Sequence, residues 1–378
     1  MDGLDIMKIS EFKPIDSVGA FLRAVKHFYP DGERAFFRGQ SDSEYDVCSS
    51  FYRLLRINEY ERHAENYSYM LANELFSEFK KFMPAFEEVH TLKRYQLNDL
   101  DLMMVAQHYG LKTRLIDWSK SPLVALYFAT EAAHPERNCS VYMLYNTDGT
   151  KVVVTSSEAF SKSVIDEQKR ILALENFFRL RTGQDVGIEL LEEVNAIINM
   201  ASSNTFLSAP IGIHPDIRAY DAIKLCAIAQ GKSCKGFHSI FEKGIVNALA
   251  PISGVKIVSH CHYIIEALPI NPRIKNQQGV LLFSNYLDKP VFANSIFSDR
   301  VIVSSDAMED LHQKDKSRGT VRIDIPGKFA KEIHRELNLY GISRDFIYPE
   351  ITSFTQVMQD QVVAKMTRSF HESKSARL

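Results

Sequence analysis

The chain has 378 residues, of which 45% are hydrophobic and 24% are charged, values that argue against a disordered, collagenous or coiled-coil protein. Its formal net charge of −2 supplies no overall basic field, so nucleic acid is a less favoured partner. The sequence shows neither a secretory leader pattern nor an apolar run of about 18 residues, and we therefore expect no membrane span and a cytoplasmic location.

The first predicted elements are a helix over IDSVGAFLRAVKHFY and a short strand over ERAFFRG. Gly39 at the end of that strand permits a tight exit or a close backbone approach. A helical pattern follows from about 54 to 95, and the next helix begins at Asn98 or Asp99 and stops at Gly110. Ser121 and Pro122 then resemble the cap and first residue of an apolar, buried helix, with NCSVYMLYN as a strand packed beneath it.

The remaining elements divide the chain into a core and an insertion. Residues 151–254 contain polar-rich amphipathic helices and are interpreted as a helical insertion or subdomain. The strands HYIIEALPI and GVLLFSN bracket NPRIKNQQG, and VRIDIP precedes the helix GKFAKEIHRELNLYG. We therefore predict an α+β fold with a mixed or antiparallel β core flanked by helices. Its parts are 1–150, the insertion 151–254, 255–357, and a polar tail 358–378 that we expect to fray.

Three stretches combine charge, aromatic residues and glycine beyond what core packing requires. In FFRGQ, the stem of Arg38 follows two aromatics, and its planar donors suit a carboxylate or phosphate. The alternative is an internal ion pair with Asp117. Gly39 would leave room beside the guanidinium for a ligand. Gln40 is a further candidate for ligand contact.

The second stretch, QHYGLKTRLIDWSKSP, contains the single tryptophan of the chain. Its candidates are Gln107, His108, Tyr109, Arg114, Asp117, Trp118 and Ser119. The alternative is a capped helix end and a turn, with an Arg114–Asp117 salt bridge and Trp118 in the core.

The third stretch, NPRIKNQQG, offers Arg273 and the amides of Asn276, Gln277 and Gln278. The alternative is a plain hairpin loop. Elsewhere, His260, Cys261 and His262 lack a further ligand at zinc-site spacing, so we expect no metal.

At these residues the chain resembles the FRG domain family, named for the motif that stands here as Phe37, Arg38 and Gly39. FFRGQSD, AQHYGLKTRLIDWSKSPLVALYFA, RIKNQQGVLLF and ELNLYGISRDFIYPEI carry the resemblance over about residues 16 to 357. It implies a bacterial setting among suspected phage-defence genes more firmly than an activity.

The chain is more distantly similar to the ADP-ribosyltransferase fold. That resemblance implies that Arg38 contacts NAD, that WSKSPLVALYFA is the serine strand and its helix, and that Asn276, Gln277 and Gln278 form the acidic loop. A neutral amide at Gln278 departs from that family's catalytic glutamate. Asp117, or more remotely Glu350, is the candidate for the missing carboxylate.

These features predict a phage-defence or toxin-type effector that binds a nucleotide such as NAD as its substrate, acting as an ADP-ribosyltransferase or NAD glycohydrolase. Arg38, His108, Asp117 and Gln278 are the predicted catalytic residues. The predicted ligand-binding residues are Gln40, Tyr109, Arg114, Trp118, Ser119, Arg273 and Gln277. One alternative is a noncatalytic sensor whose helical insertion docks a protein partner. Another is a nuclease or nucleic-acid binder.

Overall fold

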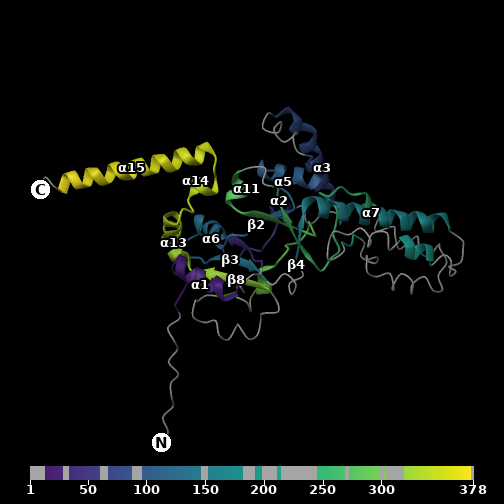
Figure 1. Ribbon diagram of the computed structural model, residues 1–378, viewed down its shortest axis with the longest axis horizontal. Coiled ribbons are helices and arrows are strands. Elements are labelled where there is room, and N and C mark those ends of the chain that lie inside the picture. The colour runs from purple at the N-terminus through teal and green to yellow at the C-terminus, as the bar shows by residue number, and fades with distance from the viewer. Residues whose placement is uncertain are drawn as a thin grey trace, which may run out of the picture.

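A computed structural model gives the fold of the chain (Figure 1). It describes residues 13–28, 34–59, 67–86, 96–145, 152–181, 192–197, 211–213, 245–268, 272–297, 301–302 and 319–375.

A mixed sheet forms the centre of the molecule, with strand order β4-β5-β6-β2-β1-β3-β8-β7. The strands are β1 (Phe36–Gln40), β2 (Leu115–Ser119), β3 (Cys139–Leu144), β4 (Val152–Ser156), β5 (His262–Glu266), β6 (Gly279–Phe283), β7 (Val301–Ile302) and β8 (Thr320–Ile325). Neighbours are antiparallel except at the two ends of the sheet, where β4–β5 and β7–β8 are parallel. The predicted α+β class with a mixed β core is confirmed.

Three helices cover the sheet around β1, β3 and β8: α1 (Val18–Phe28), α6 (Pro122–Glu131) and α13 (Gly327–Leu339) (Figure 1). The start of α6 follows the prediction, since Ser121 caps it by accepting from the Val124 N–H and Pro122 is its first residue. Successive residues Val124, Ala125 and Leu126 are all buried, as the apolar pattern predicted.

A second group of helices packs near β5 and β6: α3 (Tyr67–Phe82), α5 (Asp99–His108) and α7 (Ser157–Leu180). The predicted boundaries of α5 are confirmed. Asn98 and Asp101 form a reciprocal capping box at its start, and Gly110 takes the left-handed φ of +94° just after its end. Three short helical segments are α2 (Ser50–Ile57), η2 (Met83–Ala85) and η4 (Asn294–Phe297), and η4 contacts β8 through the hydrogen bond from Arg322 to Asn294.

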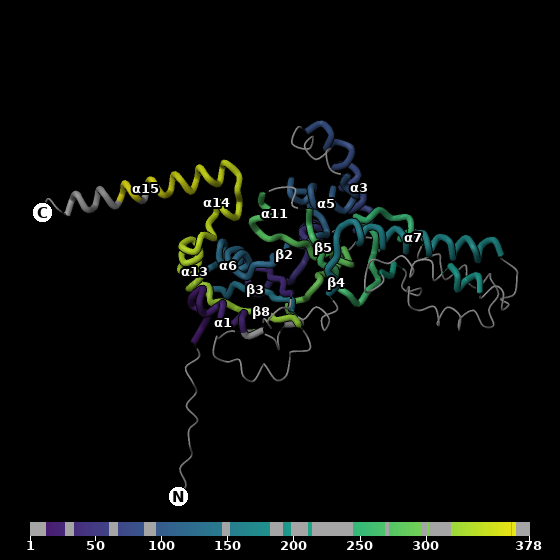
Figure 2. The backbone as a smooth tube through the Cα atoms, viewed as in Figure 1, coloured from purple at the N-terminus to yellow at the C-terminus, as the bar shows by residue number. Residues whose placement is uncertain are grey.

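Residues 152–156, which sequence analysis assigned to the helical insertion, form strand β4. It pairs with β5 in register from Val152 opposite His262 to Ser156 opposite Glu266, so segments more than 100 residues apart lie side by side (Figure 2). The helical pattern of the insertion is seen in α7. Much of residues 182–244 lies outside the described ranges.

Gly39 allows the close backbone approach that was one of its two predicted roles. A Cβ at this position would lie 1.9 Å from the Ala125 carbonyl oxygen and 2.5 Å from the Ala129 nitrogen. The glycine therefore seats α6 directly on β1. In the direction of an added Cβ the space beside Gly39 is filled by this helix, although Gly39 still lines the cavity described below.

Two C-terminal segments differ in detail from expectation. The alternative reading of NPRIKNQQG as a hairpin loop agrees with the antiparallel pairing of β5 and β6, but Pro272–Asn276 in this connection form the short helix α11. The expected polar, fraying tail is instead helix α15 (Ile351–Ser375), which follows α14 (Arg344–Ile347). No glycine or proline interrupts residues 351–375, so the sequence contains no strong helix breaker there. None of the helices within the described ranges combines the length and apolarity needed to cross a bilayer.

Candidate functional site

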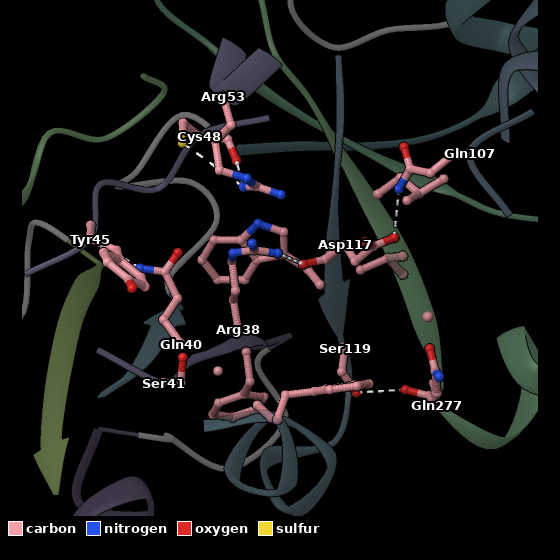
Figure 3. Close-up of a pocket in the computed structure, with 18 of the residues that line it drawn as sticks. Arg38, Gln40, Ser41, Tyr45, Cys48, Arg53, Gln107, Asp117, Ser119 and Gln277 are labelled. Atoms are coloured by element: carbon pink, nitrogen blue, oxygen red, sulfur yellow. Dashed lines mark hydrogen bonds between the residues drawn. The ribbon is translucent and has the colours of Figure 1, made fainter. Parts of the chain in front are cut away.

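A cavity of about 870 Å³ opens beside the central strands (Figure 3). Its walls come from β1, the loop 41–48, α2, α5, β2, α6, α11 and β6. A smaller cavity of about 180 Å³ shares Arg38, Arg53, Gln107 and Asp117 with it. Residues from all three predicted stretches therefore meet at one place.

Arg38 lies at the centre of this site (Figure 3). Its Nη1 donates to the Asp117 backbone carbonyl over 2.6 Å, whereas its buried Nε has no hydrogen-bond partner in the described part of the chain. The predicted alternative was an ion pair with the Asp117 carboxylate, but the hydrogen bond from Arg38 goes to the Asp117 backbone carbonyl. Burial lowers the pKa of Arg38, with Asp117 opposing that shift and Arg53 adding to it. An anion that enters the cavity would stabilise the charged form of Arg38, and so offset both the cost of its burial and the repulsion from Arg53.

Arg53 and Arg56 are lining residues that sequence analysis missed. Both lie on α2, which Ser49 caps by accepting from the Tyr52 N–H. Arg53 donates to the Cys48 carbonyl over 3.1 Å, and this bond holds it above Arg38 (Figure 3). The available signal was the basic spacing RLLR, fourteen residues after the FRG motif. Together the arginines bring positive charge to a cavity whose lining also includes Glu44, Asp46 and Asp117.

Asp117 supplies a carboxylate to both cavities. Its side chain is exposed, and its Oδ1 accepts a 2.8 Å hydrogen bond from Gln107 Nε2. The Gln107 carbonyl in turn accepts from the Thr113 hydroxyl, which fixes the amide orientation. The carboxylate is thus oriented by a chain of side chains while staying open to a ligand.

Trp118 and Ser119 continue β2 along the cavity. Trp118 is 3% exposed, and its buried Nε1 has no hydrogen-bond partner among the residues described. Ser119 donates to the Gln277 carbonyl over 2.7 Å and accepts from the Ser121 N–H, so it ties α11 to the start of α6. On β1, Gln40 lines the cavity and donates to the Tyr45 carbonyl over 3.0 Å.

His108 and Arg273 line another part of the cavity. Burial lowers the pKa of His108, Arg273 lowers it further, and Glu350 opposes the shift. The imidazole is therefore neutral at pH 7 and able to accept a proton. Arg273 lies 4.9 Å from the Tyr348 ring centre, and Gln277 Nε2 donates to the Ile347 carbonyl over 3.0 Å. These contacts hold α11 against the end of α14.

Three predicted site residues do not line either cavity. Arg114 is 2% exposed, and its donors are occupied by the backbone carbonyls of Ile252, Ser253, Val255, Ser284 and Asn285. Its guanidinium also lies 4.2 Å from the Phe283 ring centre, and burial lowers its pKa to about 9. Arg114 therefore fastens separate backbone segments together, neither holding a phosphate nor pairing with Asp117.

Tyr109 and Gln278 are the other two corrections. Tyr109 caps the end of α5 with its side chain 52% exposed and its ring edge against His108. Gln278 is exposed with a left-handed φ of +47°, and its carbonyl accepts from the Lys120 N–H. This turn directs Gln277, in place of Gln278, to the cavity. No group of three or more His, Cys, Asp or Glu side chains among the described residues is arranged to hold a metal.

Comparison with known proteins identifies one part of the chain. Residues 33–138 match the family model of the FRG domain, which confirms the resemblance seen at the motif. The match runs from just before β1 to just before β3 and includes Arg38, Arg53 and Asp117. No curated protein and no solved structure matches the chain. Its likeness to the ADP-ribosyltransferase fold therefore stays a prediction.

Proposed function

We propose that this chain is a nucleotide-binding effector whose cavity takes a pyrophosphate-containing nucleotide such as NAD. The FRG domain at residues 33–138 agrees with such a role in general terms. A volume of about 870 Å³ is in the range of cavities that enclose small organic ligands.

The observation that carries the proposal is the state of Arg38. Its guanidinium faces the cavity with a buried, unpartnered Nε, and Arg53 stands opposite it. Burial disfavours the charged form of Arg38 most, Asp117 opposes this without bonding the guanidinium through its carboxylate, and the like charge of Arg53 adds to the cost in the empty site. A diphosphate would satisfy both guanidinium groups with charge-assisted hydrogen bonds.

The cavity also contains groups suited to the rest of such a ligand. Trp118 and Phe128 offer apolar surface, and Gln40 offers a polar side chain. The oriented carboxylate of Asp117 is placed to stabilise positive charge on a ribose.

We further propose that the reaction is cleavage of the glycosidic bond of NAD. The bond between ribose C1′ and nicotinamide nitrogen breaks, and its electron pair leaves with nicotinamide. Asp117 stabilises the cationic sugar, water or an acceptor nucleophile forms the new bond to C1′, and neutral His108 takes the proton released. This assignment moves the role predicted for Gln278 to a carboxylate on β2.

Isothermal titration of the full chain with NAD and with ADP-ribose tests the binding proposal. Arg38→Gln should weaken both ligands about 100-fold, since it removes charge-assisted bonds to phosphate. Arg335→Gln is the matched control, because Arg335 is an exposed arginine on α13 that pairs with the exposed Glu332 and does not line the cavity. Equal affinity of Arg38→Gln and the unaltered chain, with both folded, would refute the proposal.

Chromatography of NAD incubated with the protein tests the reaction separately. We expect nicotinamide to be released by the unaltered chain and by Arg335→Gln, and Asp117→Asn to bind NAD while releasing little. Bound NAD that stays intact over long incubation would contradict catalysis and favour the noncatalytic sensor. That alternative draws support from the position of Gln278 outside the cavity.

A further inference from the structure

Two buried nitrogen donors in the cavity have no hydrogen-bond partner in the described part of the chain. They are Nε of Arg38 on β1 and Nε1 of Trp118 on β2, and both side chains line the cavity. Folded proteins pair nearly all of their buried polar atoms, because a buried donor without an acceptor costs free energy that water supplies in the unfolded chain. Two such donors in one cavity therefore point to a ligand that accepts from both.

The pairing of the two strands explains why these donors lie near each other. Phe37 lies opposite Ser119 in the antiparallel pair of β1 and β2, so Arg38 and Trp118 are the next residues on their strands and share the other face of the sheet. Trp118 packs on that face in a cluster with Phe36, which precedes Arg38 by two residues and points the same way. The guanidinium and the indole therefore border the same part of the cavity.

The flanking strands do not supply an acceptor for either donor. Tyr142 lies opposite Arg38 on β3, and its hydroxyl donates to the Tyr45 carbonyl over 3.1 Å. Val280 lies opposite Trp118 on β6, and its side chain is apolar. Because both nitrogens are buried, bulk water does not satisfy them either, and an acceptor has to enter through the cavity.

An oxyanion is the class of ligand that fits these donors. Guanidinium and indole N–H groups donate and do not accept, so they suit a ligand that has acceptor oxygens and no competing donor. A phosphoryl group has several such oxygens, and its charge strengthens each hydrogen bond that it accepts. One oxygen can accept from Arg38 while another accepts from Trp118.

We propose that Trp118 is a specificity-determining residue whose indole N–H donates to the phosphoryl group held by Arg38. The inference deepens the proposed function and rests on it for the identity of this group, which is the diphosphate of the nucleotide. The indole ring then contributes more than apolar surface, since its N–H selects a phosphoryl oxygen over an uncharged group of similar size.

The unaltered full chain, labelled with ¹⁵N-tryptophan, tests this hydrogen bond without a substitution. Trp118 is the single tryptophan of the chain, so its indole N–H gives a single nuclear magnetic resonance signal. Inorganic pyrophosphate should move this signal downfield, because a charge-assisted hydrogen bond forms. Adenosine, which has no phosphate, should not move it downfield. A signal that pyrophosphate leaves in place, or that adenosine moves equally far downfield, overturns the proposal.

Trp118→Phe tests the same donor by binding, because it keeps an aromatic ring and removes the N–H. Isothermal titration should show pyrophosphate binding weakened by about 10-fold or more, as expected for the loss of one hydrogen bond to a charged acceptor. Tyr263→Phe is the matched control, since it also removes a donor from a buried aromatic side chain of the sheet, on β5 and outside the cavity. Circular dichroism checks that both variants fold, and undiminished affinity in folded Trp118→Phe overturns the proposal.

The role of Trp118 and the nucleotide function can fail separately in these experiments. If NAD and ADP-ribose bind and pyrophosphate leaves the indole signal in place, the role of Trp118 is refuted and the nucleotide site stands. If pyrophosphate moves the signal downfield and NAD does not bind, the oxyanion role of Trp118 stands and the nucleotide function is refuted. If pyrophosphate does not bind to the unaltered chain, the oxyanion role is refuted.

Discussion

Replacing Gly39 by alanine tests whether the FRG motif is a packing device as well as a ligand site. The added Cβ would lie 1.9 Å from the Ala125 carbonyl oxygen, whereas ordinary contact begins near 3.4 Å. Helix α6 would have to retreat by about 1.5 Å, and both nearest atoms belong to its backbone, so no side-chain rotation relieves the clash. The retreat would open a core in which Ala125 and Ala129 are at most 1% exposed. We expect a loss of about 3 kcal/mol or more in the free energy of unfolding.

Urea denaturation followed by tryptophan fluorescence measures this loss, because the single tryptophan, Trp118, is 3% exposed and becomes solvated on unfolding. Gly279→Ala is the matched control, since Gly279 also lines the cavity but its added Cβ would meet nothing closer than 3.5 Å. The control should change stability by less than about 1 kcal/mol. If the free energy of unfolding of Gly39→Ala lies within 1 kcal/mol of that of the unaltered chain, the close packing of α6 on β1 described above is wrong.

Two further predictions concern the buried Arg114 and the partly buried His262, both outside the cavity. Arg114→Gln should cost about 3–5 kcal/mol in urea denaturation because it leaves buried carbonyls without donors; a cost below 1 kcal/mol would contradict the fastening role. Burial lowers the pKa of His262 to about 4, below its unfolded value of about 6.5, so the unfolded chain binds the proton first. As pH falls from 7 to 4, this histidine should lower the free energy of unfolding by roughly 3 kcal/mol. Unfolding measured at pH 7, 5 and 4 should show that His262→Leu lacks this part of the pH dependence. An unchanged pH slope in the variant would argue against a buried, neutral imidazole.

Local signals in the sequence predicted the fold well where neighbouring residues decide the structure. The start of α6 follows from Ser121 and Pro122, and the end of α5 follows from Gly110. The apolar runs of β3 and β6 are bounded by polar residues and became strands. Strand β4 was missed because its short run, VVVTS, leads directly into the long helix α7. Its pairing with β5 depends on residues more than 100 positions away.

The candidate site was predictable only in part, because the role of each arginine depends on partners that are distant in the sequence. Arg38 and Arg114 both stand beside apolar residues, and nothing local distinguishes a ligand-binding arginine from one that binds backbone. The difference comes from distant partners, because the carbonyls of Ser284 and Asn285 reach Arg114, whereas within the described ranges the Asp117 carbonyl is the hydrogen-bond acceptor seen for Arg38. The choice between adjacent glutamines was decided by a left-handed residue at Gln278, a conformation that the sequence alone did not suggest.

The three residues of the motif point to alternate faces of strand β1 and therefore have different roles. Phe37 packs in the core shared with α6, and Arg38, one residue on, points to the opposite face and into the cavity. Gly39 returns to the helix side, where the absence of a side chain lets the Ala125 and Ala129 backbone of α6 lie against β1. On the neighbouring strand β2, Ser119 donates to the Gln277 carbonyl just after α11. The glycine therefore acts on the cavity indirectly, by setting how close α6 stands to the strand that carries Arg38.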